Sequence, residues 1–303
     1  MHHTQVAIDG QGGIELAQQG PFRYNVREMT RRERLERCYR GEPVDRPAVY
    51  SRTGMPADDP SYYRLRALLR ERTECKAIWS SFGLDAPYAI DSRIEPYAPD
   101  WDRRVNVLHT PAGDQTATHL VSRQGQPGLH ERFFVDGPAA AERYLSLPLP
   151  EVDDDVSAFF AGDAEVGDAG IAEANLGFNT AGFIAELCGS ETFALMSITH
   201  RDVLHALCER QQRLLLRRLD VLLACSLGPY FSILGQEYLV PPLHVPADLD
   251  DFNVRYDGPI IERIHDAGGR VHVHCHGSVA RVLDGFLAMG RRCAAPHRDA
   301  AHG

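Results

Sequence analysis

The sequence predicts an α/β protein built from parallel strand-helix-strand units, and three observations support this fold class. From residue 172 onward, short apolar runs alternate with long amphipathic stretches. The helical stretches are long enough to carry the chain back for another parallel strand. The chain has 303 residues, 44% of them hydrophobic, which is enough for one large α/β-barrel domain or two ordinary domains.

The first clear element is a helix that begins after Thr30. Thr30 suits an N-cap position, Glu33 completes a capping box, and Gly41 ends the helix. Residues 1–28 lack a clear period, so we expect them to form a weakly ordered arm. The next expected elements are a strand at 47–50, a helix at 62–77, a strand at 84–90, two strands around a turn at 110–114, and a short helix at 138–147.

The second half of the chain carries the parallel units. Its expected strands are 172–178, 229–235 and 270–274, and its expected helices are 183–196, 202–225, 248–267 and 279–289. The two strands around the turn at 110–114 interrupt this order, so they would form an insertion in a parallel sheet.

Composition limits the partners and the location of the protein. The net charge is −10, so the chain lacks the basic surface that phosphate binding needs, and we expect no nucleic acid and no membrane as partners. The best apolar run, 221–234, is broken by Gly228-Pro229 and is shorter than the ~20 residues of a membrane span. The N-terminus has no apolar signal core, and the seven cysteines are widely spaced. We therefore expect a cytoplasmic protein.

Three histidines at the last predicted strand form the best candidate for chemistry. Residues two apart in a strand share a face, so His272, His274 and His276 would lie on one side, ~6–7 Å apart along the strand. Two such imidazoles can bind one zinc ion, but they are equally consistent with hydrogen-bonded structural histidines. Three cannot reach one ion, so we expect His272 to lie in the barrel interior. Cys275 would face the other way and pack under a helix.

A second candidate follows the strand at 229–235, where Glu237 and Tyr238 occur. A carboxylate placed after a buried strand is costly unless it is solvated, paired or bound to a metal. Glu237 is therefore either a hydrogen-bond acceptor for the next loop or a metal ligand.

An ordered series of motifs resembles the uroporphyrinogen decarboxylase superfamily over residues 29–290. The motifs are Thr30-Arg-Arg-Glu-Arg-Leu, Arg40-Gly-Glu-Pro-Val-Asp-Arg-Pro47, Thr110-Pro-Ala-Gly113, Glu186-Leu-Cys-Gly-Ser-Glu-Thr-Phe193, and Ile264-His-Asp-Ala-Gly-Gly269 followed by His274-Cys-His-Gly277. The resemblance implies a TIM-type (β/α)8 barrel, which the strand-helix rhythm allows.

The resemblance also implies site residues, which differ between the branches of the superfamily. For the decarboxylases, Arg52 would bind a substrate carboxylate and Asp85 would be the catalytic aspartate. A single arginine is too few to bind a substrate with several carboxylates. Decarboxylation of a tetrapyrrole or a smaller acid is therefore only the alternative to methyl transfer. For the corrinoid methyltransferases, His274 and His276 would bind zinc. Glu237 is our own candidate for a further ligand or a catalytic proton carrier, and Tyr238 for substrate contact.

A methyltransferase of this kind passes a methyl group to a corrinoid on a partner protein. The family's late strand has His-x-Cys-Gly, and here His276 replaces the cysteine ligand. A nitrogen ligand leaves zinc more Lewis-acidic than a thiolate does, which suits activation of an ether or hydroxyl oxygen. We therefore expect a metal-dependent O-demethylase or methyltransferase.

Residues 291–303 do not resemble the family, which continues with another strand and a His-Pro-Ile-Glu-like segment. One permitted set of codons for 291–302, read one base later, encodes Gly-Ala-Ala-Leu-His-Pro-Ile-Glu-Met-Pro-Pro, which suggests a frameshift after Gly290. A chain truncated in this way would leave the barrel incomplete at its C-terminus. An inactive remnant is therefore a third possible reading.

Overall fold

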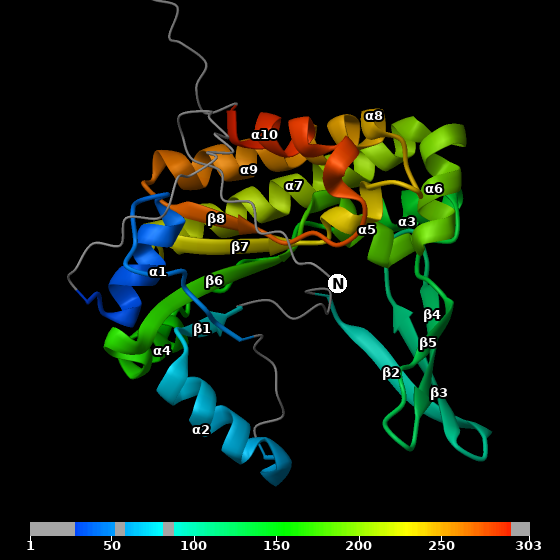
Figure 1. Cartoon of the computed structure of the whole chain (residues 1–303). Helices are drawn as coiled ribbons and strands as arrows, with labels where there is room; N and C mark the ends of the chain where they lie inside the picture. Colours follow the sequence, from blue (N-terminus) through cyan, green and yellow to red (C-terminus); the bar gives the residue numbers. More distant parts are fainter. Residues whose placement is uncertain (1–27, 52–57, 81–87, 292–303) are drawn as a thin grey trace, which may run out of the picture.

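The protein is an α/β protein with one parallel and one antiparallel sheet. The computed structural model describes residues 28–51, 58–80 and 88–291 (Figure 1). The parallel sheet has the order β1-β6-β7-β8, and the antiparallel sheet has the order β2-β3-β4-β5. The parallel strands are β1 (Cys75–Trp79), β6 (Gly170–Phe178), β7 (Tyr230–Leu234) and β8 (Arg270–Val273).

The parallel strands neighbour one another in the order in which the chain visits them. An isolated parallel bridge pairs Tyr50 with Glu74, the residue before β1. Tyr50 is the last residue of the strand that the sequence predicted at 47–50. A doubly wound sheet reverses its order at a switch point, whereas an α/β barrel does not. The described residues thus contain sequential parallel strands, but these do not close into a barrel.

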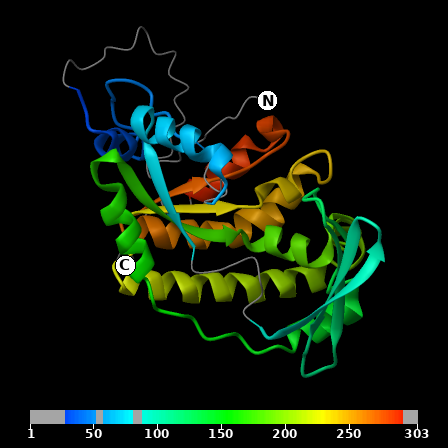
Figure 2. The same cartoon turned by 90° about the horizontal axis from the view of Figure 1, so that it is seen from below.

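The helices that join the parallel strands and cover the sheet lie on one of its faces. They are α4 (Ser157–Val166), α7 (Arg201–Ala224) and α9 (Arg255–Asp266), with α10 (Leu283–Arg291) packed against α9. Figures 1 and 2 show α7 and α9 running alongside β6, β7 and β8. The largest core cluster joins this face to the helices, and it includes Ala172, Ala174, Phe231, Ile233, Phe159, Leu219 and Ile264. Burial of these apolar side chains is the main stabilising term of the fold.

The opposite face of the parallel sheet is polar. Residues Lys76, Glu173, Ser232 and His272 share it, because β1, β6, β7 and β8 align them by register. Lys76 and Glu173 form a buried ion pair at 2.9 Å, and Tyr39 donates a hydrogen bond to Glu173. A buried charge is tolerable only when it is paired, so this face depends on the helix α1 (Arg31–Tyr39), which carries Tyr39.

Helix α1 is held in place by an ion network at the amino-terminal ends of the strands. Arg34 is buried and forms hydrogen bonds with Asp45 at 2.6 and 2.7 Å and with Glu74 at 2.7 Å. Arg46 also binds Glu74, at 2.7 Å, and Val49 donates its backbone N–H to the same carboxylate. The Asp45-Arg46 part of the motif therefore has a structural role, because it connects α1 to β1.

The antiparallel sheet is inserted between β1 and β6 and projects from the rest of the protein (Figure 1). The predicted hairpin is confirmed: β3 and β4 pair around a turn in which Gly113 donates to Thr110 at 3.0 Å and has a φ of 113°. Its strands are β2 (Ile90–Ala98), β3 (Trp101–Leu108), β4 (Gln115–Ser122) and β5 (Leu129–Arg132).

A second core cluster connects this insertion to the helices α3 (Pro138–Leu145), α5 (Thr180–Cys188) and α6 (Ser190–Thr199) and to the first half of α7. Among the residues that the structure describes, no single helix is long and apolar enough to cross a bilayer. Helices α5 and α6 pass that test only as a pair bent by 109°, and most of the α5 side chains are buried inside the protein.

Several predicted boundaries are wrong, each for a local reason. The helix predicted at 62–77 is a short 3-10 turn (Pro60–Tyr62) and α2 (Tyr63–Arg72), after which the chain enters β1 because its ladder to β6 outweighs helical propensity. The helix predicted at 183–196 breaks at Gly189, whose φ is 78°. The helix predicted at 248–267 consists of α8 (Pro246–Leu249), a π-helical turn (Asp250–Val254) and α9. The sequence did not predict β1, β5 or α4, and of β2 it predicted only the first residue, Ile90.

The remaining short elements are 3-10 turns at Gly167–Ala169, Gln236–Leu239 (η3) and Val279–Arg281. The predicted N-terminal cap of α1 is present, since the Thr30 hydroxyl accepts the backbone N–H of Glu33 at 3.0 Å. Arg291, assigned from the sequence to the aberrant tail, lies in α10. The arm at 1–27, most of the strand predicted at 84–90, and residues 292–303 lie outside the described residues.

The network around Arg34 predicts a large stability difference between two arginines of one helix. Replacing Arg34 by Met leaves Asp45 without its cation and leaves the buried Glu74 with Arg46 alone, and we expect this to cost about 3–5 kcal/mol. Replacing Arg37, which makes a partly exposed ion pair with Glu33 at 3.3 Å, is expected to cost about 0.5 kcal/mol. Urea unfolding of the two variants measures both values, and equal losses would contradict a central role for Arg34.

The same network predicts loss of stability in acid. Its hydrogen bonds to Arg34 hold the pKa of Asp45 well below the ordinary value of 3.8. A depressed pKa means that this contribution is complete above the ordinary value and declines as the pH falls below it. The free energy of unfolding of the wild type should therefore fall more steeply below about pH 4 than that of Asp45→Asn. Parallel curves in urea titrations between neutral pH and pH 2 would show that Asp45 makes no such contribution.

Candidate active site at the carboxyl ends of the strands

Three loops meet where the parallel strands β6, β7 and β8 end. They begin at Asn179, at Gly235 and at His274, and the side chains proposed from the sequence for metal binding and substrate contact lie on the last two. In parallel α/β proteins the carboxyl ends of the strands are the usual place of function.

His274 and His276 converge. The Nε2 atoms of the two rings are 2.8 Å apart, and the rings are nearly perpendicular at a centroid distance of 4.4 Å. The backbone of His274 still donates to Ile233 at 2.9 Å, but β8 ends at Val273 and His276 lies beyond it. The prediction that both rings share a face of one strand is thus wrong for His276. A turn that continues to Gly277, with a φ of 97°, brings the rings together.

His272 stays apart from this pair, as expected from the sequence. It lies on the polar face of the sheet, with its Nδ1 4.0 Å from a Glu173 oxygen and its ring 6.4 Å from that of His274. Burial lowers the pKa of His272. It therefore belongs to the interior of the sheet face rather than to its carboxyl edge.

Cys275 and Glu237 are both partly buried. Cys275 packs against the main core cluster, as predicted, and burial together with the nearby charge of Glu237 raises the pKa of its thiol to about 12. The Oε2 atom of Glu237 is buried and makes no hydrogen bond with the described residues. A buried carboxylate oxygen without a donor is costly, so Glu237 is poised to receive a donor or a cation.

Tyr238 is directed towards α5. Its hydroxyl donates a hydrogen bond to the carboxylate of Glu186, and its ring lies 6.2 Å from that of Phe178. Burial and the Glu186 carboxylate raise the pKa of Tyr238. In the sequence Glu186 stands out only as part of a family motif. No local pattern predicts its contact with Tyr238, which lies far along the chain.

The fit of a metal ion to this site is partial. Two imidazoles on one tetrahedral zinc ion would have their nitrogens about 3.3 Å apart, so a small opening of the observed pair would admit the ion. A catalytic zinc site needs three protein ligands. Within residues 28–51, 58–80 and 88–291, however, no group of three or more His, Cys, Asp or Glu residues is placed to hold a metal. The structure therefore brings together His274 and His276 but not Glu237 as a third ligand.

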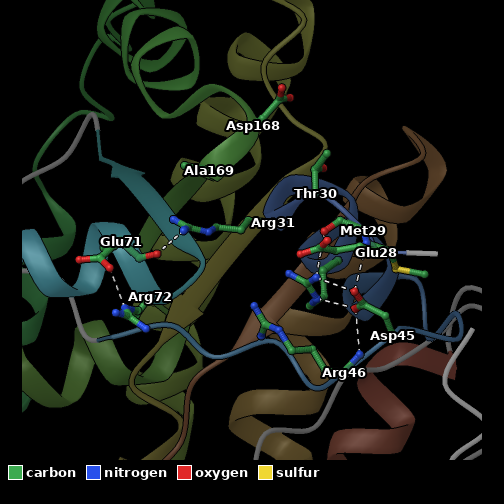
Figure 3. Close-up of a pocket in the computed structure, with 11 residues that line it drawn as sticks. Glu28, Met29, Thr30, Arg31, Asp45, Arg46, Glu71, Arg72, Asp168 and Ala169 are labelled. Atoms are coloured by element: carbon green, nitrogen blue, oxygen red, sulfur yellow. Dashed lines mark hydrogen bonds and ion pairs between the residues drawn. The ribbon is translucent and has the colours of Figure 1, made fainter. Parts of the chain in front are cut away.

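A polar pocket of about 670 Å³ lies at the opposite, amino-terminal ends of β1 and β6 (Figure 3). It is lined by the α1 network and by Arg31 and Arg72. Arg31 donates to the last carbonyls of α2, and Arg72 pairs with Glu71 at 2.8 Å. Arg31, Arg34 and Arg72 thus already have partners within the fold.

Comparison of the chain with protein-family models, with curated proteins and with solved structures gives no match. The resemblance to the uroporphyrinogen decarboxylase superfamily is therefore a prediction from the sequence motifs alone. Two residues carried over from that resemblance, Arg52 and Asp85, lie outside the described residues.

Substitution by alanine should have opposite effects at Gly277, in the turn after His276, and at Gly162, in α4. Gly277 has a φ of 97°, and an added Cβ would lie 3.1 Å from Val240, so Gly277→Ala should cost about 1–2 kcal/mol. Gly162 is inside α4 and has ordinary space for a Cβ, 3.4 Å from Ala77, so Gly162→Ala should gain about 0.5–1 kcal/mol. Urea unfolding measures both, and a neutral Gly277→Ala would contradict this conformation of the turn.

Proposed function

We propose that the protein is a metal-dependent methyltransferase or O-demethylase that passes a methyl group to a corrinoid on a partner protein. One observation carries the proposal: the imidazoles of His274 and His276 converge at the carboxyl edge of the parallel sheet. Zinc is the metal that best suits two histidine nitrogens. The motif at this position is also the one in which the chain resembles the corrinoid methyltransferases.

The fold supports a place for this site in a (β/α)8 barrel. The parallel strands follow one another in chain order, and the helices α4, α7 and α9 that precede β6, β7 and β8 pack on a single face. Both features are expected of part of a barrel, and the polar face that carries Glu173 and His272 would then face the interior. The site residues would lie at the mouth of that barrel.

Four residues of this chain would have distinct roles in the proposed methyl transfer. His274 and His276 would hold the metal ion, which as a Lewis acid would polarise the oxygen that bears the methyl group. Glu237, whose buried Oε2 lacks a hydrogen bond within the described residues, would supply the proton that the departing oxygen needs, or would complete the ligand set. Tyr238, held by Glu186, would contact the substrate.

Metal analysis tests the proposal directly. After dialysis against zinc and removal of excess ion, the wild type should retain about one equivalent per chain. His274→Ala and His276→Ala should each lose most of it, because a single remaining imidazole binds zinc weakly. His200→Ala is the matched control, since His200 is an exposed histidine that precedes α7, and its metal content should equal that of the wild type. Metal content unaffected by both site changes would remove the proposal.

An activity assay separates the alternatives. Zinc-loaded protein incubated with a methyl ether and reduced cobalamin should form methylcobalamin, which is followed by its absorbance, and His276→Ala should abolish this rate. Release of carbon dioxide from a carboxylic acid, unaffected by a chelator, would instead support the decarboxylase. The absence of a cooperative thermal transition in the wild type would support an inactive remnant.

A further inference from the structure

Buried cations of this protein are neutralised by carboxylates in two places but not in a third. Arg34 has two carboxylate partners, and Lys76 has one at 2.9 Å. Such pairing is usual, because an ionised group that is taken out of water without a counter-charge is costly. Arg210, in the first half of α7, is only 5% exposed. Within residues 28–51, 58–80 and 88–291, however, its hydrogen bonds go only to neutral acceptors.

The contacts of Arg210 stabilise its cation only in part. Its Nη2 donates to the backbone oxygens of Leu147 at 3.0 Å and Pro148 at 2.8 Å, and to the hydroxyl of Tyr88. The guanidinium also lies over the rings of Tyr88 and Tyr144, 5.8 and 5.6 Å from their centroids. Its Nε is buried and has no hydrogen-bond partner among the described residues. None of these contacts brings a negative charge to the buried cation.

A second buried arginine follows two turns later on the same helix. Arg218 is 7% exposed, and Leu214, between the two arginines, is 4% exposed, so the three side chains form a buried stripe at helical spacing. Burial lowers the pKa of Arg218 to about 10, as expected of a cation held away from water. The two positions are about 12 Å apart along the helix. An anion beside this stripe would therefore be attracted by both charges.

An acidic segment runs along α7 without supplying that anion. Arg210 holds the start of segment 147–155, and the thiol of Cys225, at the end of α7, donates to the backbone oxygen of Asp154 at 3.8 Å. Figure 2 shows the segment alongside the helix. None of its carboxylates pairs with Arg210. Its acidic side chains are instead exposed, and they are Glu151, Asp153, Asp154 and Asp155.

We propose that Arg210 and Arg218 form a binding site for a small oxyanion, either a phosphate or a carboxylate. A planar guanidinium can bind two oxygens of such an ion through parallel N–H bonds. The two tyrosine rings beside Arg210 restrict the plane of its guanidinium, which lowers the entropy cost of binding. A net charge of −10 disfavours loose association of anions with the surface. This site goes beyond the proposed function, because it shares no residue with the methyl-transfer centre.

Isothermal titration calorimetry of metal-free protein tests the site. Inorganic phosphate and acetate are used as separate titrants, in a zwitterionic buffer that is low in chloride. The wild type should bind about one equivalent of at least one of the two ions, and the tighter of them identifies the class of oxyanion. Arg210→Lys keeps the positive charge but loses the two-pronged donor, so it should weaken binding roughly tenfold.

Two exposed arginines provide matched controls. Arg213→Lys, one turn after Arg210 on α7, and Arg72→Lys, in the polar pocket at the amino-terminal ends of the strands, should leave the affinity unchanged. The proposal is overturned if the wild type shows no saturable binding of either ion at millimolar concentrations. It is also overturned if either control weakens binding as much as Arg210→Lys does, because the ion would then bind elsewhere.

Circular dichroism and thermal unfolding show whether each variant folds. If Arg210→Lys does not fold, Arg218→Lys takes its place and is judged by the same criteria. The result is independent of the proposed function, because the titrated protein contains no metal. Zinc binding without oxyanion binding would overturn this inference alone, and oxyanion binding without zinc binding would overturn the metal-dependent function alone.

Discussion

The parallel register of β6, β7 and β8 is the constraint on which the candidate site depends. It aligns Ala174 with Phe231 and Phe231 with Val271, so that apolar side chains of all three strands face the helices together. The same register brings the loops after the three strands to one edge of the sheet. A slip of one residue in β8 would exchange its faces and place His272 in the apolar core.

The two ends of this sheet include a closely paired ion network and a carboxylate oxygen without a hydrogen bond to the described residues. At the amino-terminal end, Arg34, Asp45, Arg46 and Glu74 bind one another closely, which is the pattern of a stabilising network. At the carboxyl end, Glu237 has a buried oxygen with no hydrogen bond to the described residues. Proteins tend to tolerate such unsatisfied groups where function requires them.

Much of the fold followed from local patterns, but the geometry of the site did not. The strand-helix rhythm after residue 172, the Thr30 cap and the hairpin at Gly113 were all predictable, because each depends on neighbours in sequence. Strand β1 was missed, because Cys75–Trp79 is extended only through its pairing with distant β6. The histidine pair was predicted, although the turn at Gly277 rather than the strand pleat produces it. The hydrogen bonds of Asp257 with Asn179, Thr180 and Gln236 could not be predicted, because these residues come from three parts of the chain that only the tertiary fold unites.

The insertion of an antiparallel sheet between β1 and β6 has a consequence for how this protein can vary. The ends of the insertion are fixed by the parallel ladder, while its strands β2 to β5 pair only among themselves. Because the entropy of closing a loop grows only slowly with loop length, doubling such an excursion costs roughly 0.6 kcal/mol. The projecting sheet is therefore a place where evolution or an engineer could exchange one module for another of different size, while the ladder and the edge that carries the histidines keep their register.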